Sequence, residues 1–209
     1  MPFNIAIIDY EMGNLKSIYK LLCHLDIDSI ITSDHNKIKN ADGVILPGVG
    51  AFGDAMMQLR QKNLFDLIID LTSEGKPLFG VCLGQHMLFS QSSEMGYHKG
   101  LNIIQGKVIS FEKTLVGKIP QIGWNSVSFS NEDHYIIQEI PNNSYFYFVH
   151  SYHAIPDDPS TILGKTIYGE TEFCSMVCKE NVIAVQFHPE KSSKNGIKMY
   201  QNFVQYCRK

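Results

Sequence analysis

The sequence predicts an α/β fold in one domain over residues 1–209, with a mostly parallel, doubly wound sheet flanked by helices and additional antiparallel strands in the C-terminal half. Three observations support this prediction. Short apolar runs alternate with longer amphipathic segments in the first half, which is typical of parallel βαβ units. The second half contains mainly strand-like segments separated by turns. Hydrophobic residues make up 44% of the chain, enough to form a substantial core.

Hydrophobic periodicity assigns the elements of the first half. A buried strand is predicted at 5–8, and Leu15, Ile18 and Leu22 then recur at helical spacing after Asn14, which suits a helix N-cap. The remaining predicted elements are strands at 27–32, 44–46 and 77–81, and helices at about 53–61, 64–74 and 84–91.

The second half is predicted to contain strands at 104–111, 126–129, 145–152, 162–168, 173–178 and 182–187. In this half only the segment 195–206 has the periodicity of a helix. The segments 131–134 and 156–159 are rich in turn-forming residues and are interpreted as loops. Because the chain shows no repeat, low-complexity tract or linker, we expect all of these elements to belong to one domain.

Charge and cysteine content exclude several classes of protein. The chain has 18 basic and 21 acidic residues, so there is no electrostatic reason to expect a nucleic-acid or membrane-surface partner. The five cysteines include no C-x-x-C pair, which argues against a disulfide framework or zinc ribbon and favours a reducing compartment. The apolar run at 5–8 is interrupted by Asp9 and is too short for a signal peptide or membrane span. We therefore expect a soluble cytoplasmic protein.

The strongest local motif is Gly80-Val81-Cys82-Leu83-Gly84, which lies between a predicted strand and a predicted helix. It is the thiol version of the G-x-S-x-G nucleophile elbow, whose tight turn requires flanking residues with almost no side chain. The turn exposes the nucleophile at the carboxyl end of the strand, where open α/β sheets bind ligands. The helix start favours the thiolate, which is the attacking species. On its own, the motif is equally compatible with a buried structural cysteine.

A histidine and a carboxylate near the C-terminus supply what a cysteine nucleophile needs. His188 lies just after a predicted strand, and Glu190 follows it with Pro189 between them. A nucleophilic thiol requires a base, and the base requires an orienting partner. Proline restricts the backbone and so helps to hold the two side chains in a fixed relation. We therefore predict a catalytic triad of Cys82, His188 and Glu190.

The glycine-rich segment after the strand at 44–46 is a candidate oxyanion loop. Glycines at positions 48 and 50 permit backbone N–H groups to approach a substrate, as an oxyanion hole requires. The segment lacks the spacing of a P-loop or of G-x-G-x-x-G, so phosphate or dinucleotide binding is not expected. Without the predicted triad, this segment would be interpreted as a plain connection.

Together these motifs resemble class I glutamine amidotransferases, and more narrowly the family of glutaminase subunits of imidazole glycerol phosphate synthase. The resemblance runs from residue 5 to about residue 204 and includes the segments 46–56, 123–125, 145–152 and 186–192. It implies hydrolysis of glutamine to glutamate and ammonia. It also implies a heterodimer with a (β/α)8-barrel cyclase subunit, which uses the ammonia to make imidazole glycerol phosphate in histidine biosynthesis.

The resemblance assigns a role to each matching residue. Cys82 attacks the side-chain amide, His188 moves the proton, and Glu190 orients His188. Glu94 holds the α-amino group, and one peptide of the 48–50 loop turns to complete the oxyanion hole. The full set implied to contact the oxyanion or the glutamine is Gly48, Val49, Gly50, Leu83, His86, Glu94, Ser151 and Tyr152. The residues implied to face the cyclase at the ammonia entrance are Asn14, Trp124 and Lys191. No metal or organic cofactor is implied.

Three positions depart from the family pattern. His86 stands where the family normally has a substrate-binding glutamine, so either His86 or the neighbouring Gln85 is expected to contact the substrate. Glu11 replaces a common glycine and Gln121 a frequent histidine, both near the expected partner surface. These two departures leave open a paralogous subunit that supplies ammonia to another acceptor, such as a surface sugar.

Other interpretations are less well supported by the sequence. A non-catalytic binding subunit is suggested only by His86, and a cysteine peptidase would need an extended peptide groove that nothing in the chain resembles. His150 and His153 are interpreted as structural, because zinc would need further ligands at suitable spacing. Cys174 and Cys178 are interpreted as core residues.

Overall fold

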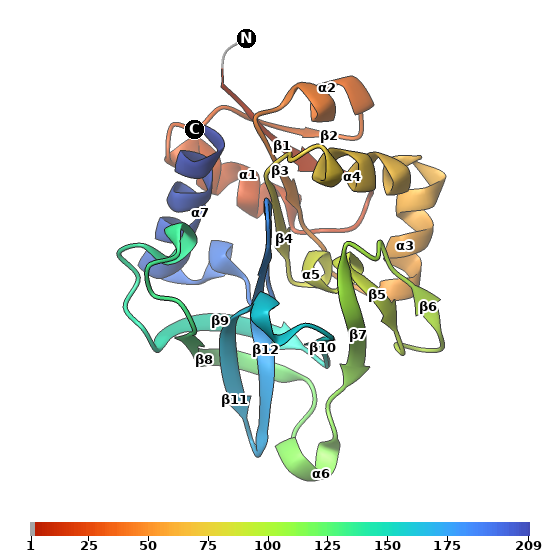
Figure 1. Cartoon of the computed structure of the whole chain (residues 1–209), viewed down its shortest axis with the longest axis vertical. Helices are drawn as coiled ribbons and strands as arrows, with labels where there is room; N and C mark the ends of the chain where they lie inside the picture. The colour runs from red at the N-terminus through yellow and green to blue at the C-terminus, as the bar shows by residue number, and fades with distance from the viewer. Residues whose placement is uncertain (1–2) are drawn as a thin grey trace.

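Five parallel strands form the centre of the computed structural model, which describes residues 3–209 (Figure 1). They are β1 (Ile5–Ile8), β2 (Ser29–Thr32), β3 (Gly43–Leu46), β4 (Leu78–Val81) and β13 (Val182–Val185). Their order in the sheet is β2-β1-β3-β4-β13. Every residue of β1, β3, β4 and β13 is buried, as expected for parallel strands that helices cover on both faces.

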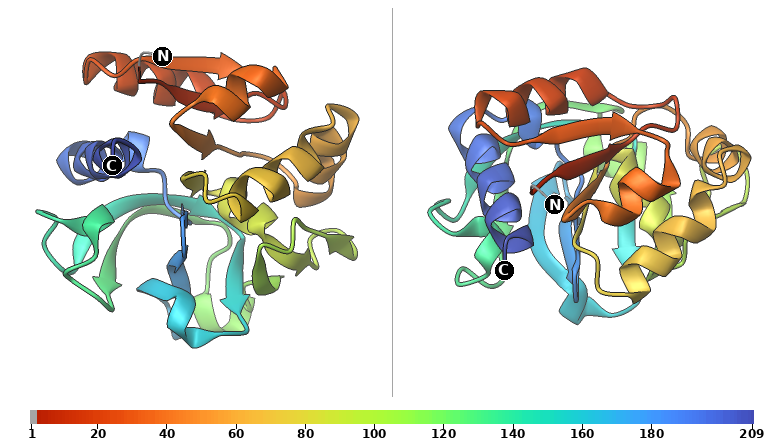
Figure 2. Two further views of the ribbon diagram at one scale, coloured as in Figure 1. Left: turned by 45° about the horizontal axis from the view of Figure 1, so that its top comes forward. Right: turned by 90° about the horizontal axis from the view of Figure 1, so that it is seen from above.

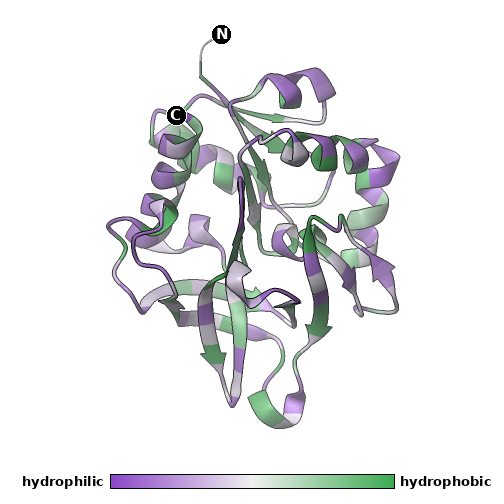
Figure 3. Ribbon diagram, viewed as in Figure 1, coloured by the Kyte–Doolittle hydropathy of each residue, from purple (hydrophilic) through white to green (hydrophobic). Residues whose placement is uncertain are grey.

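The helices that cover this sheet are divided between its two faces, because the side chains of a strand alternate in direction. Ile5 and Ile7 pack with residues of the first and last helices, whereas Ala6 and Ile8 pack with the other four. These helices are α1 (Leu15–His24), α2 (His35–Asn40), α3 (Phe52–Gln61), α4 (Leu64–Ser73), α5 (Leu83–Leu88) and α7 (Ser193–Cys207). Figure 2 shows α1 and α7 on one side of the central strands and α3 and α4 on the other, and Figure 3 shows the hydrophobic character of those strands.

A mostly antiparallel extension, in which the β5–β7 pair is parallel, continues the sheet from β13 in the order β12-β10-β7-β5-β6. β11 pairs with β12 and β8, and β8 pairs with β9. The strands of this extension are β5 (Phe89–Ser92), β6 (His98–Lys99), β7 (Ile104–Ser110), β8 (Gln121–Phe129), β9 (Ser144–His150), β10 (Tyr152–Pro156), β11 (Ile162–Tyr168) and β12 (Thr171–Lys179). Short helical turns complete the chain: α6 (Lys113–Val116), η1 (Tyr135–Ile137), η2 (Pro159–Thr161) and η3 (Pro189–Lys191). The predicted α/β class with added antiparallel strands is therefore confirmed, in a sheet that is mixed.

The helix predicted at 84–91 is wrong in its second half. α5 ends at Leu88, and Phe89 begins β5, which pairs with β7. The carbonyl oxygens at the end of α5 accept hydrogen bonds from a later segment, at 2.8 Å from Leu101 to Met87 and 3.0 Å from Ile103 to Leu88. These long-range bonds end the helix, and nothing in its local sequence indicates them.

The strand predicted at 145–152 is two strands that separate at Ser151. β9 pairs with β8, whereas β10 pairs with β7 and β12, so the chain passes from one group of strands to another at this residue. β8 begins at Gln121 rather than at 126, and α2 was not predicted. Asn14 is the N-cap residue of α1 as expected, but its side chain accepts a hydrogen bond from the Ser17 hydroxyl at 2.7 Å instead of capping the helix.

Strands from both halves of the chain pair with each other where β13 lies beside β4. That residues 1–209 form one domain stays a prediction. Within residues 3–209, no helix has both the length and the apolar character needed to cross a membrane.

Candidate active site

Cys82 occupies a strained turn between β4 and α5. Its φ of 55° and ψ of −111° lie in a region that non-glycine residues rarely adopt. A Cβ on Gly84 would overlap the carbonyl oxygen of Leu46, and a Cβ on Gly80 would lie 2.9 Å from the Cβ of Ala184. Both glycines are therefore required by close packing, and the turn has the geometry predicted for a nucleophile elbow.

His188 and Glu190 form a buried pair beside this turn. His188 Nδ1 lies 2.8 Å from Glu190 Oε1, and the two side chains are 3% and 1% exposed. His188 Nε2 has no hydrogen-bond partner among residues 3–209, and Cys82 is its electrostatic partner. Burial alone would lower the pKa of His188, but its interactions with Cys82 and Glu190 outweigh burial and raise the pKa to about 10. The charged imidazolium thus lies beside Cys82, where a cysteine nucleophile needs its partner for proton transfer.

The glycine-rich loop at 48–50 is tightly packed at Gly48 and exposed at Val49. The hydroxyl of Tyr10, which is fully buried, donates to the carbonyl oxygen of Pro47 at 2.7 Å. A Cβ on Gly48 would lie 2.7 Å from that hydroxyl and 2.9 Å from the amide nitrogen of Gly84. Val49 is 40% exposed, and Gly50 has a φ of +96°. The loop thus packs directly against the first turn of α5, where backbone N–H groups of a helix are free to bind an anion.

A cavity of about 470 Å³ opens beside Cys82 and is large enough for an amino acid. It brings together residues from distant parts of the chain: Val49, Gly50, Cys82, Leu83, His86, Glu94, Pro120, Val149, His150, Ser151, Tyr152 and His188. Most of the predicted site residues therefore share one cavity. Gly48 and Glu190 do not line it. Within the loop, Gly48 is packed against Leu83, and Glu190 is buried behind His188.

Glu94 places a carboxylate at the edge of this cavity. Its Oε2 accepts a hydrogen bond of 3.0 Å from the backbone N–H of Phe52, the first residue of α3. Burial raises the pKa of Glu94, and the bond from Phe52 partly opposes this effect. A half-buried carboxylate at the edge of a cavity is suited to a small cationic group.

His86 lines the cavity and Gln85 does not. His86 Nε2 lies 2.6 Å from Gln186 Oε1, and burial lowers the pKa of His86 to about 4, so the ring is neutral at physiological pH. Gln85 is fully buried, and neither polar atom of its side chain has a hydrogen-bond partner within residues 3–209. Of the two candidates for substrate contact, the geometry favours His86.

Gln186 was not among the predicted site residues, although it interacts with both the nucleophile and His86. Its side chain is fully buried, with Nε2 4.0 Å from Cys82 Sγ. A glutamine that directly follows the buried strand Val182–Val185 is the one signal in the sequence that could have indicated it.

His150 does more than the structural role expected for it, because it also lines the cavity. Its Nδ1 lies 2.8 Å from the carbonyl oxygen of Tyr152, and its Nε2 lies 3.0 Å from Gln121. Burial lowers the pKa of His150 to about 3. Gln121 is thus buried beneath the expected partner surface rather than part of it. Among residues 3–209, no three His, Cys, Asp or Glu side chains are placed to hold a metal ion.

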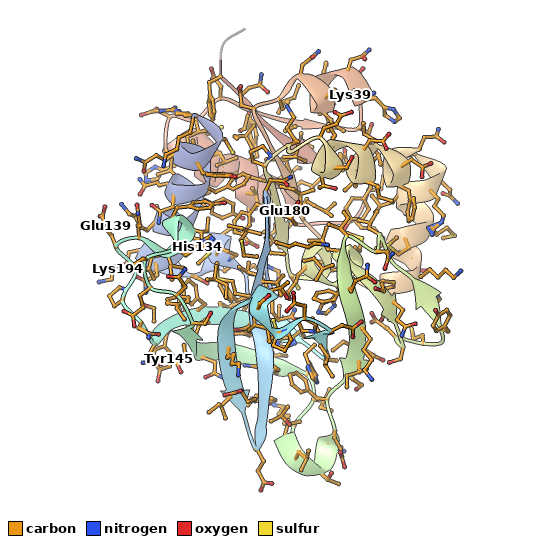
Figure 4. All side chains as sticks on the ribbon, viewed as in Figure 1. Lys39, His134, Glu139, Tyr145, Glu180 and Lys194 are labelled. Atoms are coloured by element: carbon orange, nitrogen blue, oxygen red, sulfur yellow. The ribbon has the colours of Figure 1, made fainter. Side chains whose placement is uncertain are left out.

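An apolar strip lies on the outer face of β8 and β9, next to the cavity. Trp124 is 52% exposed and Ile122 59%, and the cross-strand neighbour of Trp124 is Tyr147. Tyr145 projects from β9 away from the core (Figure 4), and Val149 on the same strand lines the cavity. We call these five residues, 122, 124, 145, 147 and 149, the β8–β9 strip.

Two of the three predicted interface residues are close together. Lys191 Nζ lies 5.8 Å from the ring centroid of Tyr147, which also packs edge-on against Trp124. Asn14 is the N-cap residue of α1, and α1 packs against η3, the turn that contains Lys191. Glu11, also expected near this surface, is exposed and pairs with Lys62 at 2.9 Å.

Comparison with known proteins gives a consistent result. The model of the family described as glutamine amidotransferase class-I matches residues 6–206. A protein of Sulfurimonas denitrificans named imidazole glycerol phosphate synthase subunit HisH is 44% identical, with 97% of this chain and 98% of that protein covered. A protein of Pyrococcus furiosus with the same name is 46% identical, covering 95% of this chain and 97% of the relative.

Solved structures show the same fold at much lower identity. The structure of PurLQS from Thermotoga maritima aligns with a TM-score of 0.76 at 18% identity, covering 99% of both chains. A glutamine amidotransferase from Thermotoga maritima aligns with a TM-score of 0.64 at 16% identity, covering 100% of this chain and 86% of the other.

Proposed function

Because this chain belongs to the class I glutamine amidotransferase family, we propose that it is a glutaminase acting as one subunit of an imidazole glycerol phosphate synthase. The main observation behind this proposal is the arrangement of Cys82 in a strained elbow beside the buried His188–Glu190 pair, at one cavity. The names of the HisH relatives, which are 41–46% identical across nearly their whole length, support the specific pathway.

The first half of the reaction is acyl transfer to sulfur. Cys82 Sγ forms a bond to the side-chain carbonyl carbon of glutamine, and the carbonyl electron pair moves onto oxygen. Backbone N–H groups of Leu83 and of the 48–50 loop stabilise this oxyanion. His188 donates its proton to the amide nitrogen as the C–N bond breaks. Ammonia leaves and a γ-glutamyl thioester remains on Cys82.

The second half is hydrolysis of the thioester. Water attacks the same carbonyl carbon and gives a proton to the neutral His188 imidazole. The C–S bond then breaks, so that glutamate leaves and the thiolate–imidazolium pair returns. Glu190 acts throughout by orienting His188 and favouring its charged form, which is the role of the third member of a triad.

The cavity also provides groups to orient glutamine. Glu94 would hold the α-amino group, since its carboxylate reaches the cavity from the start of α3. His86, Ser151 and Tyr152 would contact the rest of the substrate, because all three line the same cavity. The positions of these side chains support roles as binding residues rather than as proton donors.

The β8–β9 strip, with Lys191 and Asn14 at its edge, is proposed as the surface that binds a (β/α)8-barrel cyclase. Exposed tryptophan and tyrosine side chains of this kind are typical of protein interfaces. Because Val149 belongs to both the strip and the cavity lining, a partner bound here would cover the cavity mouth. Ammonia could then pass directly into the partner within a heterodimer.

A cytoplasmic location suits this chemistry, because a reducing compartment keeps a catalytic thiol from oxidation. A paralogue that supplies ammonia to a different acceptor would keep the same triad. The HisH relatives do not favour it, and Gln121, one of the two positions that suggested it, is buried.

The test of this proposal is glutamate production by the chain alone, with the cyclase subunit, and with the cyclase and its nucleotide ligand. We expect strong stimulation by the liganded cyclase. Cys82→Ala should abolish activity, while Cys23→Ala, which removes an exposed free cysteine, should leave it unchanged. Glutaminase activity that is the same with and without the cyclase would favour the paralogue. The absence of glutamate in every condition would indicate a binding subunit.

A further inference from the structure

We propose that Gln186 is a positioning residue that directs an amide N–H at the sulfur of Cys82, and that His86 fixes the orientation of this amide. The inference rests on the proposed glutaminase function and extends it to two residues that hold the nucleophile. It explains how a histidine can occupy position 86 in this active site.

The sheet places Gln186 and Cys82 side by side. β4 and β13 are parallel neighbours, and their last residues, Val81 and Val185, lie opposite each other. The residues that follow them, Cys82 and Gln186, are therefore also neighbours. The backbone N–H of Cys82 donates to the carbonyl oxygen of Val185 at 2.8 Å. Gln186 is anchored in turn, because its own N–H donates to Ser175 at 2.9 Å.

Both ends of the Gln186 amide are used, although the side chain is fully buried. Its oxygen lies 2.6 Å from His86 Nε2, and its nitrogen lies 4.0 Å from Cys82 Sγ. His86 reaches this position because it follows Cys82, the N-cap of α5, by four residues, which is about one helical turn. The three residues thus form a chain of contacts from α5 to the adjacent strand and back to the nucleophile.

The His86 contact determines which end of the amide faces the sulfur. Gln186 Oε1 only accepts hydrogen bonds, so the neutral His86 ring must carry its proton on Nε2 and donate it. This bond holds Nε2 of Gln186, the donor end, toward Cys82. With the amide reversed, a carbonyl oxygen would face the thiolate and repel it.

Two groups therefore favour a negative charge on Cys82: the His188 imidazolium through its positive charge, and the Gln186 amide through a hydrogen bond. Hydrogen bonds to a charged acceptor stabilise its charged form. The other titratable groups near the thiol are Tyr10, which follows β1, the cavity-lining Glu94, His150 and Tyr152, and Glu190 behind His188, besides His86 itself. None of these contacts the sulfur through a hydrogen bond within the described residues 3–209, so the amide is a separate contribution.

The test is the rate of Cys82 alkylation by iodoacetamide as a function of pH, followed by peptide mass spectrometry so that the other cysteines do not interfere. Gln186→Leu should raise the pH midpoint of alkylation by about one unit. At a pH below both midpoints, this variant would then contain about tenfold less thiolate than the parent. Gln186→Glu should raise the midpoint further, because it places a negative charge beside the sulfur. His86→Leu should raise it less than Gln186→Leu does, since the amide remains but is no longer held.

Two variants serve as matched controls. His86→Gln should keep the parent midpoint, because its amide can also donate to Gln186. Asn202→Leu removes a buried amide on α7 that bonds to Ile136 and Gln138, so it should lower the melting temperature without moving the midpoint. The inference is overturned if folded Gln186→Leu alkylates with the parent profile, or if Gln186→Glu lowers the midpoint. Should Gln186→Leu not fold, Gln186→Glu and His86→Leu decide the matter in the same assay.

Because alkylation requires no substrate, this experiment is independent of the proposed function. A parent protein that makes no glutamate would refute glutaminase activity, while the alkylation midpoints would still decide the role of Gln186.

Discussion

Replacing Gly84 by alanine tests how closely the nucleophile elbow packs against the segment that leads into the 48–50 loop. Gly84 is the second residue of α5, and an added Cβ would overlap the carbonyl oxygen of Leu46 and lie 3.0 Å from its carbonyl carbon. These are backbone atoms at the end of β3, directly before the 48–50 loop, so they cannot turn aside as a flexible side chain would. Either α5 or the loop must move.

The expected loss of activity follows from how far α5 or the loop must move. Restoring normal van der Waals separation requires a shift of about 1 Å or more. A misplacement of about 1 Å in a catalytic site costs roughly 10²-fold in rate. Overpacking costs about 1–3 kcal/mol, partly offset by the gain of about 0.5–1 kcal/mol when alanine replaces glycine in a helix. We therefore expect kcat/KM to fall about 100-fold, while the protein loses only about 1–2 kcal/mol of stability.

The assay compares stimulated glutaminase activity with the free energy of unfolding in urea. Gly75→Ala is the control, because Gly75 has a φ of +86° but no atom within 4 Å of an added Cβ. Strain at that φ costs about 1–2 kcal/mol, so the control should match Gly84→Ala in stability and keep full activity. The reasoning is refuted if Gly84→Ala retains its glutaminase activity, or if Gly75→Ala loses as much activity as Gly84→Ala.

Four further predictions concern the triad, the loop and the partner surface. Glu190→Gln should lower glutaminase kcat by about 10²–10⁴-fold in steady-state assays, because His188 loses the carboxylate that orients and charges it; a change of only a few fold would contradict this role. Since the folded state raises the pKa of His188 from 6.5 to about 10, the stabilisation is complete below about pH 6.5 and is lost as the pH rises toward 10. The free energy of unfolding in urea should fall with pH in the parent and fall less in Glu190→Gln. Equal pH dependence in the two proteins would contradict the role of Glu190 in charging His188. Tyr10→Phe removes the bond to Pro47 and should cost about 1 kcal/mol in urea unfolding, with a lower stimulated activity; unchanged values would show that the bond does not hold the loop. Trp124→Ala should weaken cyclase binding by about 2 kcal/mol in calorimetry but leave Cys82 alkylation unchanged, and undiminished binding would exclude the β8–β9 strip as the partner surface.

The sequence was sufficient to predict the elements that depend on local pattern. The buried strand runs and the elbow glycines follow from hydrophobic alternation and from turn chemistry, both of which are local. The prediction that Cys82 and His188 lie close together also required only local information. Both residues follow parallel strands, and the carboxyl ends of such strands share one edge of the sheet.

The features that were not predicted depend on contacts between distant segments. α5 ends at Leu88 because amides of residues 101 and 103 bond to its carbonyl oxygens, and no residue inside 84–91 carries that information. The contact between His86 and Gln186 joins residues 100 positions apart. Its existence depends on the register of β4 and β13, which hydrophobic pattern alone does not define.

The most direct test of the account is acid quenching of the chain in complex with its cyclase during glutamine turnover, followed by peptide mass spectrometry. The account predicts a γ-glutamyl thioester on the peptide that contains Cys82, absent when Cys82 is replaced by alanine. A glutamyl adduct on Cys174 or Cys178 instead, or full glutamate production by Cys82→Ala, would contradict it.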